Sequence, residues 1–156
     1  MMAFLICTSL PAVASFDLKI LHINDHHSHL DGAYFTMDTS SLIGGVAKAK
    51  IGYGGFPRIV TLMKDLAEQA APDQHVLKLH AGDAITGTLW HTMFKGRADA
   101  EMMGKVCFDA FTLGNHEFDD GDDGLAKFLE ALAETGCGTK VPCANLHPET
   151  LDPELN

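Results

Sequence analysis

Short apolar runs alternate with segments of helical periodicity along the chain, and this alternation limits the possible folds more than any other feature. It is typical of βαβ units, in which helices connect the strands of a parallel or mixed sheet. We therefore predict an α/β fold. The expected strands are Phe16 to Asn24, Val76 to Ala81, Asp109 to Leu113 and Val141 to Leu146, and the expected helices cover residues 56–70, 98–105 and 122–135.

The first expected helix shows its pattern most clearly. Pro57 stands near the first turn, where a missing N–H is tolerated, and Ile59, Leu62, Met63 and Leu66 recur at the spacing of one helical face. This face should pack on the sheet.

Residues 31–55 lack such a period and are rich in Gly and Ser, so we predict a long loop there. Loops of this length in compact domains are usually functional or mobile. The 156 residues of the chain suit one domain with a substantial core.

The chain is acidic, with a formal net charge of -10 and only 11 Lys and Arg residues. Nucleic-acid binding through counterion release needs a basic surface, so we expect no nucleic-acid partner. A phosphorylated substrate would need help from metal ions or a few well-placed cations. The nine His and 21 Asp and Glu residues could supply metal ligands.

The first 15 residues, MMAFLICTSLPAVAS, carry no charge and include the small-x-small pattern Ala12-Val13-Ala14 that signal peptidase accepts. Their apolar part is shorter than the ~20 residues that span a bilayer. We predict a secretory signal over 1–15, truncated at its start because no basic residue precedes the apolar run. Residues 16–156 would then be exported to the periplasm or secreted, without a membrane span. A partly buried N-terminal segment of a cytosolic protein is the alternative.

Removal of the signal leaves Cys107, Cys137 and Cys143. Cys137 and Cys143 flank the short segment GTKVP and could close it by a disulfide in an oxidising compartment. Cys107 would then remain a buried thiol. The sequence has no CxxC pair, so a cysteine zinc site is not expected.

Polar residues cluster where three of the expected strands end, in the segments NDHH, HAGD and GNHEFD. The carboxyl ends of the strands in an open α/β sheet form its ligand-binding edge. We therefore expect these segments to lie close together.

Four side chains in these segments suit a pair of divalent metal ions. Asp25 and His27 stand two residues apart and can face the same way. The Asp83 carboxylate can bridge two ions, and Asn115 offers an amide oxygen to the second. Two ions ~3.5–4 Å apart would lower the pKa of a bridging water and stabilise an in-line displacement at phosphorus. These ligands suit zinc, manganese, iron or cobalt alike.

His116 and Asp119 form a candidate catalytic dyad beside these ligands. Asp119 can hydrogen-bond the imidazole and fix its tautomer and charge. His116 would then stabilise the transition state and assist the leaving group without binding metal. We expect Glu117 and Asp120 to be solvated or to cap helices.

The other histidines are expected to have structural or surface roles. His26 should point away from the ligands if the strand continues, and His80 should support the turn that follows it. His29 could flank the site or lie in the loop. His22 is expected to be packed or hydrogen-bonded, and the expected surface residues are His75, His91 and His147.

The segments ILHINDHHSHL, HAGDAITGT and TLGNHEFDDG resemble, in order, the first three motif blocks of the calcineurin-like metallophosphoesterases. The full GNHEFD block with GDxxxGT before it is similar to that of the 5'-nucleotidase family within this superfamily. The resemblance implies a layered α/β/β/α sandwich, a divalent metal site at Asp25, His27, Asp83 and Asn115, and a catalytic dyad of His116 and Asp119. It also implies hydrolysis of nucleotide phosphomonoesters outside the cytoplasm.

Members of this family complete the site with later histidines, one in a GHxH-like block, and add a C-terminal nucleoside-binding domain. The only histidine beyond the dyad here is His147, without a GHxH block, so we interpret residues 16–156 as the N-terminal portion of the catalytic domain. An inactive metal-binding fragment is the alternative. Relatives that cleave 2',3'-cyclic nucleotides, nucleotide sugars or sulfur esters also remain open.

Overall fold

The computed structural model describes residues 16–38 and 48–144, so the expected signal peptide lies outside the described residues. The strands are β1 (Leu18–Ile23), β2 (Ala33–Asp38), β3 (Lys48–Tyr53), β4 (His75–His80) and β5 (Ala110–Phe111). The helices are α1 (Phe56–Glu68), α2 (Leu89–Phe94), α3 (Arg97–Val106), the 3-10 helix η1 (His116–Phe118) and α4 (Gly121–Glu134).

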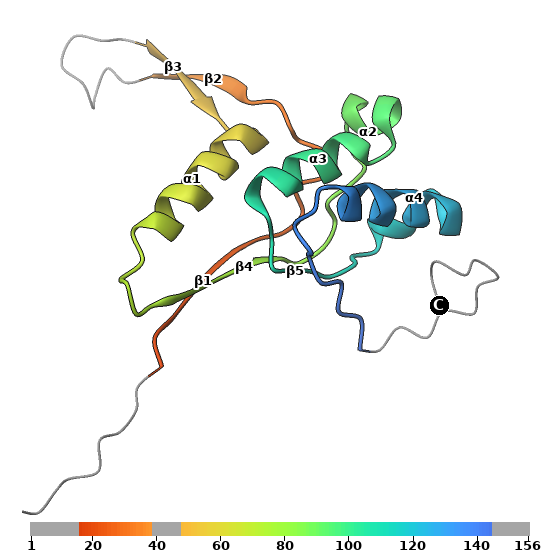
Figure 1. The fold of residues 1–156 in the computed structure, drawn as a ribbon. Helices are drawn as coiled ribbons and strands as arrows, with labels where there is room; N and C mark the ends of the chain where they lie inside the picture. The colour runs from red at the N-terminus through yellow and green to blue at the C-terminus, as the bar shows by residue number, and fades with distance from the viewer. Residues whose placement is uncertain (1–15, 39–47, 145–156) are drawn as a thin grey trace, which may run out of the picture.

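A parallel sheet in the order β1-β4-β5 forms the base of the fold (Figure 1). Leu18 pairs with His75 at one end of β1 and Ile23 with His80 at the other, and β4 continues to β5 through Leu79 and Ala110. This confirms the predicted α/β class. Because the strands are parallel and adjacent, the segments that follow them emerge at the same edge.

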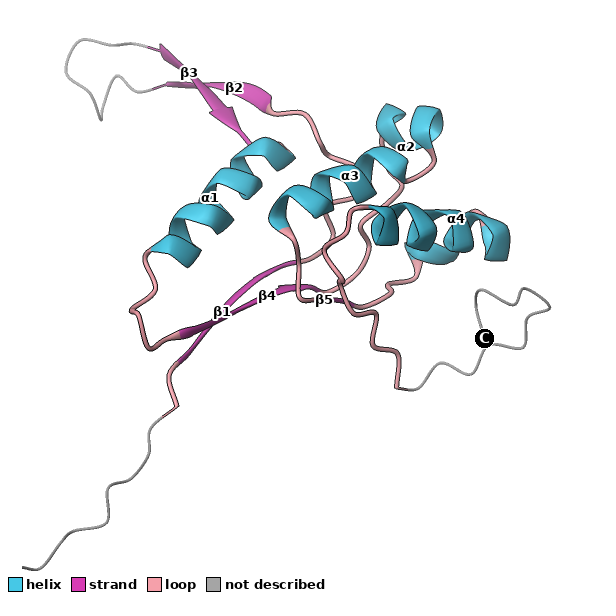
Figure 2. Cartoon of the chain, in the orientation of Figure 1, coloured by secondary structure: helices cyan, strands magenta, loops and turns pink. Residues whose placement is uncertain are grey.

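The helices α1, α3 and α4 gather on one face of this sheet (Figure 2). Phe56, Phe108, Phe111 and Phe128 are fully or almost fully buried between the layers. Burial of such side chains supplies most of the driving force for folding, at about 1.5–3 kcal/mol each. On the face of α1 that was predicted to pack on the sheet, Met63 is buried, whereas Leu62 is exposed. No helix among the described residues has the length and apolar character needed to cross a bilayer.

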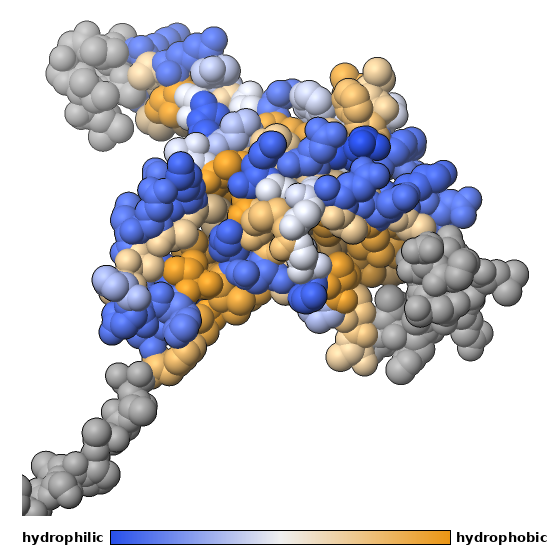
Figure 3. All heavy atoms as spheres, in the orientation of Figure 1, coloured by the Kyte–Doolittle hydropathy of each residue, from blue (hydrophilic) through white to orange (hydrophobic). Residues whose placement is uncertain are grey.

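The opposite face of the sheet is uncovered within the described residues. Leu18 and Ile20 are 42% and 52% exposed, whereas Leu21, on the helical side of the strand, is buried. The ammonium of Lys19 reaches the helical layer and donates to the Leu66 carbonyl at 3.1 Å. Figure 3 shows apolar surface along the sheet below the polar outer faces of the helices. A half-buried sheet of this kind leaves apolar area available to another layer.

The loop predicted for residues 31–55 is wrong, because its described parts form an antiparallel hairpin of β2 and β3. Phe35 contacts Tyr53 across the strands at a ring separation of 5.5 Å, and Lys50 lies over the Tyr34 ring. Cross-strand aromatic contacts of this kind stabilise a hairpin. Both faces are largely exposed, so the strands lack the apolar alternation that would have revealed them.

Two other elements differ from prediction. The short helix α2 was missed, because six residues are too few to show a helical period; its N-terminus is capped by Thr88, whose hydroxyl accepts the Trp90 N–H at 3.2 Å. The strand expected at Val141 to Leu146 is absent from its described residues, which end at Ala144. A single parallel bridge joins Ala110 to Lys140 just before it.

The expected cysteine pairing is also wrong. Cys107 and Cys137 form a disulfide, and Cys143 has a free thiol. Cys107 follows α3 and Cys137 follows α4, and the packing of these two helices brings their C-terminal ends, and with them the two thiols, together. The Cys137–Cys143 pairing was inferred from proximity in sequence, whereas the packing of two helices decides the actual partner.

We predict that breaking this disulfide destabilises the fold. Its cysteines are 30 residues apart, and cross-linking a loop of that size contributes about 3–4 kcal/mol by restricting the unfolded chain. Urea unfolding of the Cys107→Ala/Cys137→Ala variant should show this loss, whereas Cys143→Ala should unfold like the wild type. A bridged Cys137–Cys143 peptide in a non-reducing digest would contradict the assignment.

Candidate metal and catalytic site

Backbone hydrogen bonds join the turns that follow β1 and β4. The N–H groups of Asp25, His27 and Ser28 donate to the carbonyls of residues 82, 83 and 84 at 3.0, 3.1 and 2.9 Å. The two turns therefore form one unit. This unit brings the candidate ligands Asp25 and His27 beside Asp83, as the strand-end argument predicts.

The turn after β5 completes the site. The His116 N–H donates to Oδ1 of Asp83 at 3.0 Å. Gly82 and Gly114 allow this close approach: a Cβ on Gly82, which has φ 95°, would lie 2.6 Å from the Gly114 nitrogen, and a Cβ on Gly114 would lie 2.2 Å from Asp83 Oδ1. Only glycine fits at these two positions without moving the facing turn.

Three of the predicted ligands have left-handed backbone conformations, with φ of 52° at Asp25, 45° at His27 and 53° at Asp83. Such conformations cost roughly 1–2 kcal/mol for residues other than glycine. Asp and His tolerate them better than most residues do. The hydrogen bonds between the turns offset this cost, and strain of this kind is concentrated at functional sites.

His27, Asp83 and His116 each place a potential ligand atom within 4.8 Å of the others, so one divalent ion can be held among them. Asp25 lies at the edge of this group, with Oδ1 3.7 Å from His27 Nε2. Two imidazoles and a carboxylate suit a first-row transition metal. Sequence reasoning placed His116 outside the ligand set, whereas its ring lies within reach of the same ion. Asn115 is exposed in the adjacent turn.

The Asp25 carboxylate is kept charged by its neighbours. The side-chain amide of Asn24 hydrogen-bonds it and, together with Asp83 and His27, holds the pKa of Asp25 below its usual value against the effect of desolvation. A carboxylate that is ionised at neutral pH can bind a cation without first losing a proton.

His116 and Asp119 form the dyad that the sequence predicts. Nδ1 of His116 lies 2.7 Å from Oδ2 of Asp119, and this hydrogen bond raises the pKa of His116 more than desolvation lowers it. The ring of His116 also meets the His27 ring edge-on at 5.0 Å. A raised pKa favours the protonated imidazole, which can donate to an anionic oxygen beside the ligands.

Glu117 is fully buried, contrary to the expectation that it is solvated or caps a helix. Its carboxylate accepts backbone N–H groups from Asp83, Ala84 and Gly114 at 3.0, 2.7 and 2.5 Å. One anionic side chain therefore holds the β4 and β5 turns together. Glu117 is next to His116 in sequence and so lies near the site, but the sequence alone gives no sign that its side chain points inward.

His80 supports the turn after β4, as predicted, because its Nδ1 accepts the Gly82 N–H at 3.2 Å. Burial, followed by the nearby His26, lowers the pKa of His80 to about 3. His26 is also buried and contacts His80 and Asp99, which agrees with its expected orientation away from the ligands.

The surface position predicted for His91 is wrong. Its ring is buried, and Nε2 lies 3.1 Å from Oδ2 of Asp120, in an ion-pair contact that does not meet hydrogen-bond geometry. Asp120 stands at the N-cap position of α4 but makes no capping hydrogen bond with its side chain, and it also contacts Lys95 at 3.4 Å. These contacts join α2 to the segment that follows the dyad.

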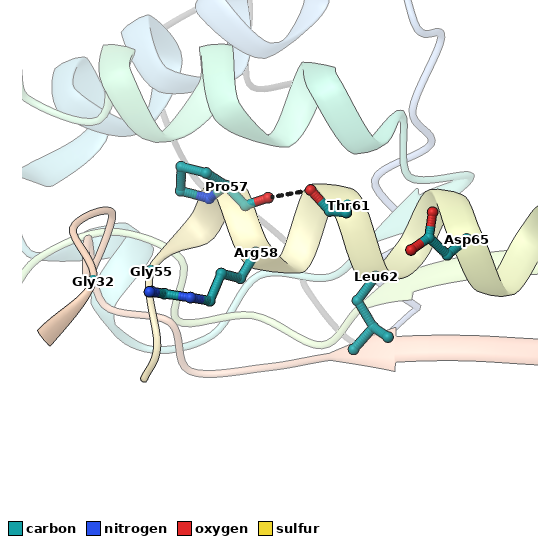
Figure 4. Close-up of a pocket in the computed structure, with 7 residues that line it drawn as sticks. All are labelled: Gly32, Gly55, Pro57, Arg58, Thr61, Leu62 and Asp65. Carbon is teal, nitrogen blue, oxygen red and sulfur yellow. Dashed lines mark hydrogen bonds between the residues drawn. The ribbon is translucent and has the colours of Figure 1, made fainter. Parts of the chain in front are cut away.

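An open hollow of about 610 Å³ lies elsewhere, at the N-terminal half of α1 (Figure 4). The Arg58 guanidinium lies beside Gly32 and Gly55 and donates to the Gly54 carbonyl at 2.6 Å, while Thr61 bonds the carbonyl one turn earlier. None of the predicted metal ligands or dyad residues lines this hollow. Arg58 therefore has a structural contact here.

A family model described as calcineurin-like phosphoesterase matches residues 18–146. The chain belongs to this family, which confirms the resemblance noted in the motif blocks. It is 47% identical over 135 residues to the NAD 5'-nucleotidase of Haemophilus influenzae and 44% identical over 117 residues to a probable 5'-nucleotidase of Treponema pallidum. These alignments cover 85% and 75% of this chain.

The fold is similar to the solved structure of the Haemophilus influenzae NAD nucleotidase, with a TM-score of 0.67 and 44% identity over 82% of this chain. The chain spans only about a fifth of the length of these relatives, 20% of the Haemophilus protein and 18% of the Treponema protein.

We predict that Glu117→Gln weakens the fold by about 2–3 kcal/mol, since a glutamine has one acceptor oxygen and turns an N–H₂ group toward backbone donors. Urea unfolding would measure the loss. Glu130→Gln, on an exposed position of α4, is the matched control. Equal midpoints for the two variants would show that the Glu117 hydrogen bonds contribute nothing net.

We also predict that His80 makes the fold sensitive to acid. The unfolded chain takes up a proton at this residue near pH 6.5, whereas the folded protein does so only near pH 3. The unfolded state therefore binds more protons between these values, and stability falls with decreasing pH by up to about 1.4 kcal/mol per pH unit.

Urea titrations between pH 7 and 4 should accordingly show a flatter pH dependence for His80→Gln than for the wild type. His75→Gln replaces an exposed histidine at the other end of β4 and should keep the wild-type slope. Parallel slopes for wild type and His80→Gln would contradict the prediction.

Proposed function

We propose that this chain is the N-terminal part of a metal-dependent phosphomonoester hydrolase of the 5'-nucleotidase type, acting on nucleotides. The observation that carries the proposal is the convergence of the three turns, with a cluster of His and Asp side chains and the His116–Asp119 dyad at one edge of the sheet. Kinship with the 5'-nucleotidases of Haemophilus and Treponema supports the substrate class.

In this proposal, two divalent ions are held by Asp25, His27, Asp83 and Asn115. Bound there, such ions supply a hydroxide nucleophile at neutral pH and neutralise charge on the phosphate. Two observations support this donor set: Asp25 is kept ionised, and His27 and Asp83 have potential ligand atoms within 4.8 Å of each other. Zinc, manganese, iron and cobalt all remain candidates.

His116 acts on the phosphate in the same proposal. Held by Asp119 and favoured in its protonated form, it donates a hydrogen bond to a phosphoryl oxygen and assists departure of the ester oxygen. Asp119 accepts the Nδ1 proton, so in the protonated ring the Nε2 proton is the one that is donated. Its carboxylate also stabilises the imidazolium.

The uncovered face of the sheet supports the proposed domain organisation. Leu18 and Ile20 expose apolar area where a second sheet of a four-layer sandwich could pack. We propose that residues 16–156 form the first half of such a catalytic domain, and that further metal ligands and the nucleotide-binding domain lie in the rest of the enzyme.

We further propose that the enzyme works in the periplasm or is secreted, after removal of residues 1–15. Two features support export: the charge-free start of the sequence and the Cys107–Cys137 disulfide, because disulfides persist mainly in oxidising compartments.

The alternative is an inactive metal-binding module. It is favoured by the compact group of His27, Asp83 and His116, which can hold one ion without any further part of the enzyme. This alternative predicts metal binding without turnover. A preference for cyclic nucleotides, nucleotide sugars or sulfur esters would depend on residues outside this chain.

A combined titration separates these functions. The metal-stripped chain is titrated with Mn²⁺ in a calorimeter, and hydrolysis of p-nitrophenyl phosphate is followed in the same samples. We expect metal-dependent turnover that is lost in Asp83→Asn and lowered about 10²–10⁴-fold in His116→Asn. Asp122→Asn, on the exposed surface of α4, should match the wild type.

Binding near one ion per chain without turnover would support the inactive module. Absence of Mn²⁺ binding by the wild type would overturn the metal site itself.

A further inference from the structure

A buried polar cluster lies behind the ligand-bearing turns, and no step of the proposed reaction uses it. It consists of Ser28, His26, His80 and Asp99, whose exposures are 0%, 8%, 2% and 0%. Asp99 belongs to the first turn of α3, whereas the others belong to β4 and the turn after β1. A buried carboxylate must be satisfied by hydrogen bonds, since leaving it unpaired would be costly.

The contacts form an unbranched series. His80 Nε2 lies 2.9 Å from His26 Nδ1, and His26 Nε2 lies 3.2 Å from Asp99 Oδ1. The Ser28 hydroxyl donates to the other oxygen, Asp99 Oδ2, at 3.0 Å. The series starts at the backbone, where the Gly82 N–H donates to His80 Nδ1.

This first hydrogen bond fixes every proton in the series. A backbone N–H can only donate, so Nδ1 of His80 must be an acceptor and its proton must be on Nε2. The proton on Nε2 points at His26 Nδ1, which must then accept. His26 consequently carries its own proton on Nε2 and donates it to Asp99. Only neutral rings, both protonated at Nε2, satisfy all of these contacts.

The hydrogen bonds from Gly82 through His80 and His26 to Asp99 all point in one direction, and we call this series the relay. Asp99 is its terminal acceptor, and the relay connects both ligand-bearing turns. His26 stands between Asp25 and His27 in the first turn. At its other end, the relay holds Gly82, the residue before Asp83. Ser28, one residue after His27, is tied to the same carboxylate. Each turn is therefore oriented from behind by a helix that contributes no candidate ligand.

We propose that Asp99 is a positioning residue that fixes the rings of His26 and His80 and so holds the two ligand-bearing turns in register. Its effect on metal affinity rests on the proposed function, whereas its effect on the turns does not. Groups that orient metal ligands from behind typically change metal affinity 10–100-fold when removed.

Two variants of Asp99 and one control distinguish the loss of its hydrogen bonds from a general loss of packing. Asp99→Asn retains an oxygen that can accept from His26, and its N–H₂ can donate to the Ser28 hydroxyl. Asp99→Ala removes both acceptors. Met103→Ala, one turn further along α3 and fully packed in the core, is the control for general destabilisation.

The first readout is the protonation of the rings, measured at neutral pH by long-range ¹⁵N–¹H correlation in the labelled chain. We expect Nε2–H tautomers for His26 and His80 in the wild type, in Asp99→Asn and in Met103→Ala. Asp99→Ala should lose this pattern at His26. A different tautomer of either ring in the wild type would overturn the relay.

The second readout is hydrogen exchange of the Asp25 and His27 amides, which donate across the turns. Relative to the amide of Phe128 in α4, these amides should exchange about tenfold faster in Asp99→Ala and unchanged in Asp99→Asn and Met103→Ala. Equal relative exchange in Asp99→Ala and the wild type would refute the positioning role.

The third readout is calorimetric Mn²⁺ binding. We expect about 10–100-fold weaker binding by Asp99→Ala and binding within about threefold of wild type for the two other variants. If the wild type binds no Mn²⁺, the proposed metal site is wrong. The ring tautomers and the amide exchange still test whether Asp99 positions the two turns. If Asp99→Ala keeps the wild-type Mn²⁺ affinity although its Asp25 and His27 amides exchange faster, the relay does not act on the metal ligands. This outcome would refute that part of the proposal.

Discussion

The hydrogen bonds between the turns after β1 and β4 are the interaction on which the site depends. Three backbone N–H groups of residues 25–28 donate to carbonyls of residues 82–84, so two segments far apart in sequence share one rigid geometry. The parallel pairing of β1 with β4 delivers both turns to the same edge. The ligand side chains then lose little further conformational freedom when an ion binds, which lowers the entropic cost of binding.

Two buried carboxylates stabilise this arrangement from different directions. Glu117 holds the β4 turn to the β5 turn through three backbone N–H groups. Asp99 contacts His26, which in turn contacts His80 behind the β1 and β4 turns. Backbone groups in irregular turns have no ladder partners, so side-chain acceptors must satisfy them. An acidic chain can supply such acceptors. Glu117 and Asp99 therefore have structural roles beside the site.

Sequence reasoning succeeded where a single local rule decides the outcome. Apolar runs and helical periodicity identified β1, β4, α1, α3 and α4, and polar segments at strand ends identified the three turns. The rule that parallel strands share an edge was sufficient to bring those turns together. The dyad of His116 and Asp119 followed from their spacing.

Most failures have a different cause, because they depend on contacts between segments distant in the chain. The partner of Cys137 is set by the packing of α3 on α4. The inward direction of Glu117 is set by N–H groups of the turn after β4 and of its own turn. His91 is buried by the helix arrangement around Asp120. The β2–β3 hairpin is exposed on both faces, so its pattern carries no burial signal. Local sequence does not encode these relations.

The left-handed backbone at Asp25, His27 and Asp83 restricts how this site can be redesigned. Branched side chains such as Val, Ile and Thr crowd the backbone in that conformation, whereas Gly, Asn, Asp and His fit it. Efforts to change metal preference at these positions therefore favour the oxygen and imidazole donors of Asn, Asp and His. A wider choice of side chains is open in the third turn, where Asn115 has an ordinary helical φ of -76°.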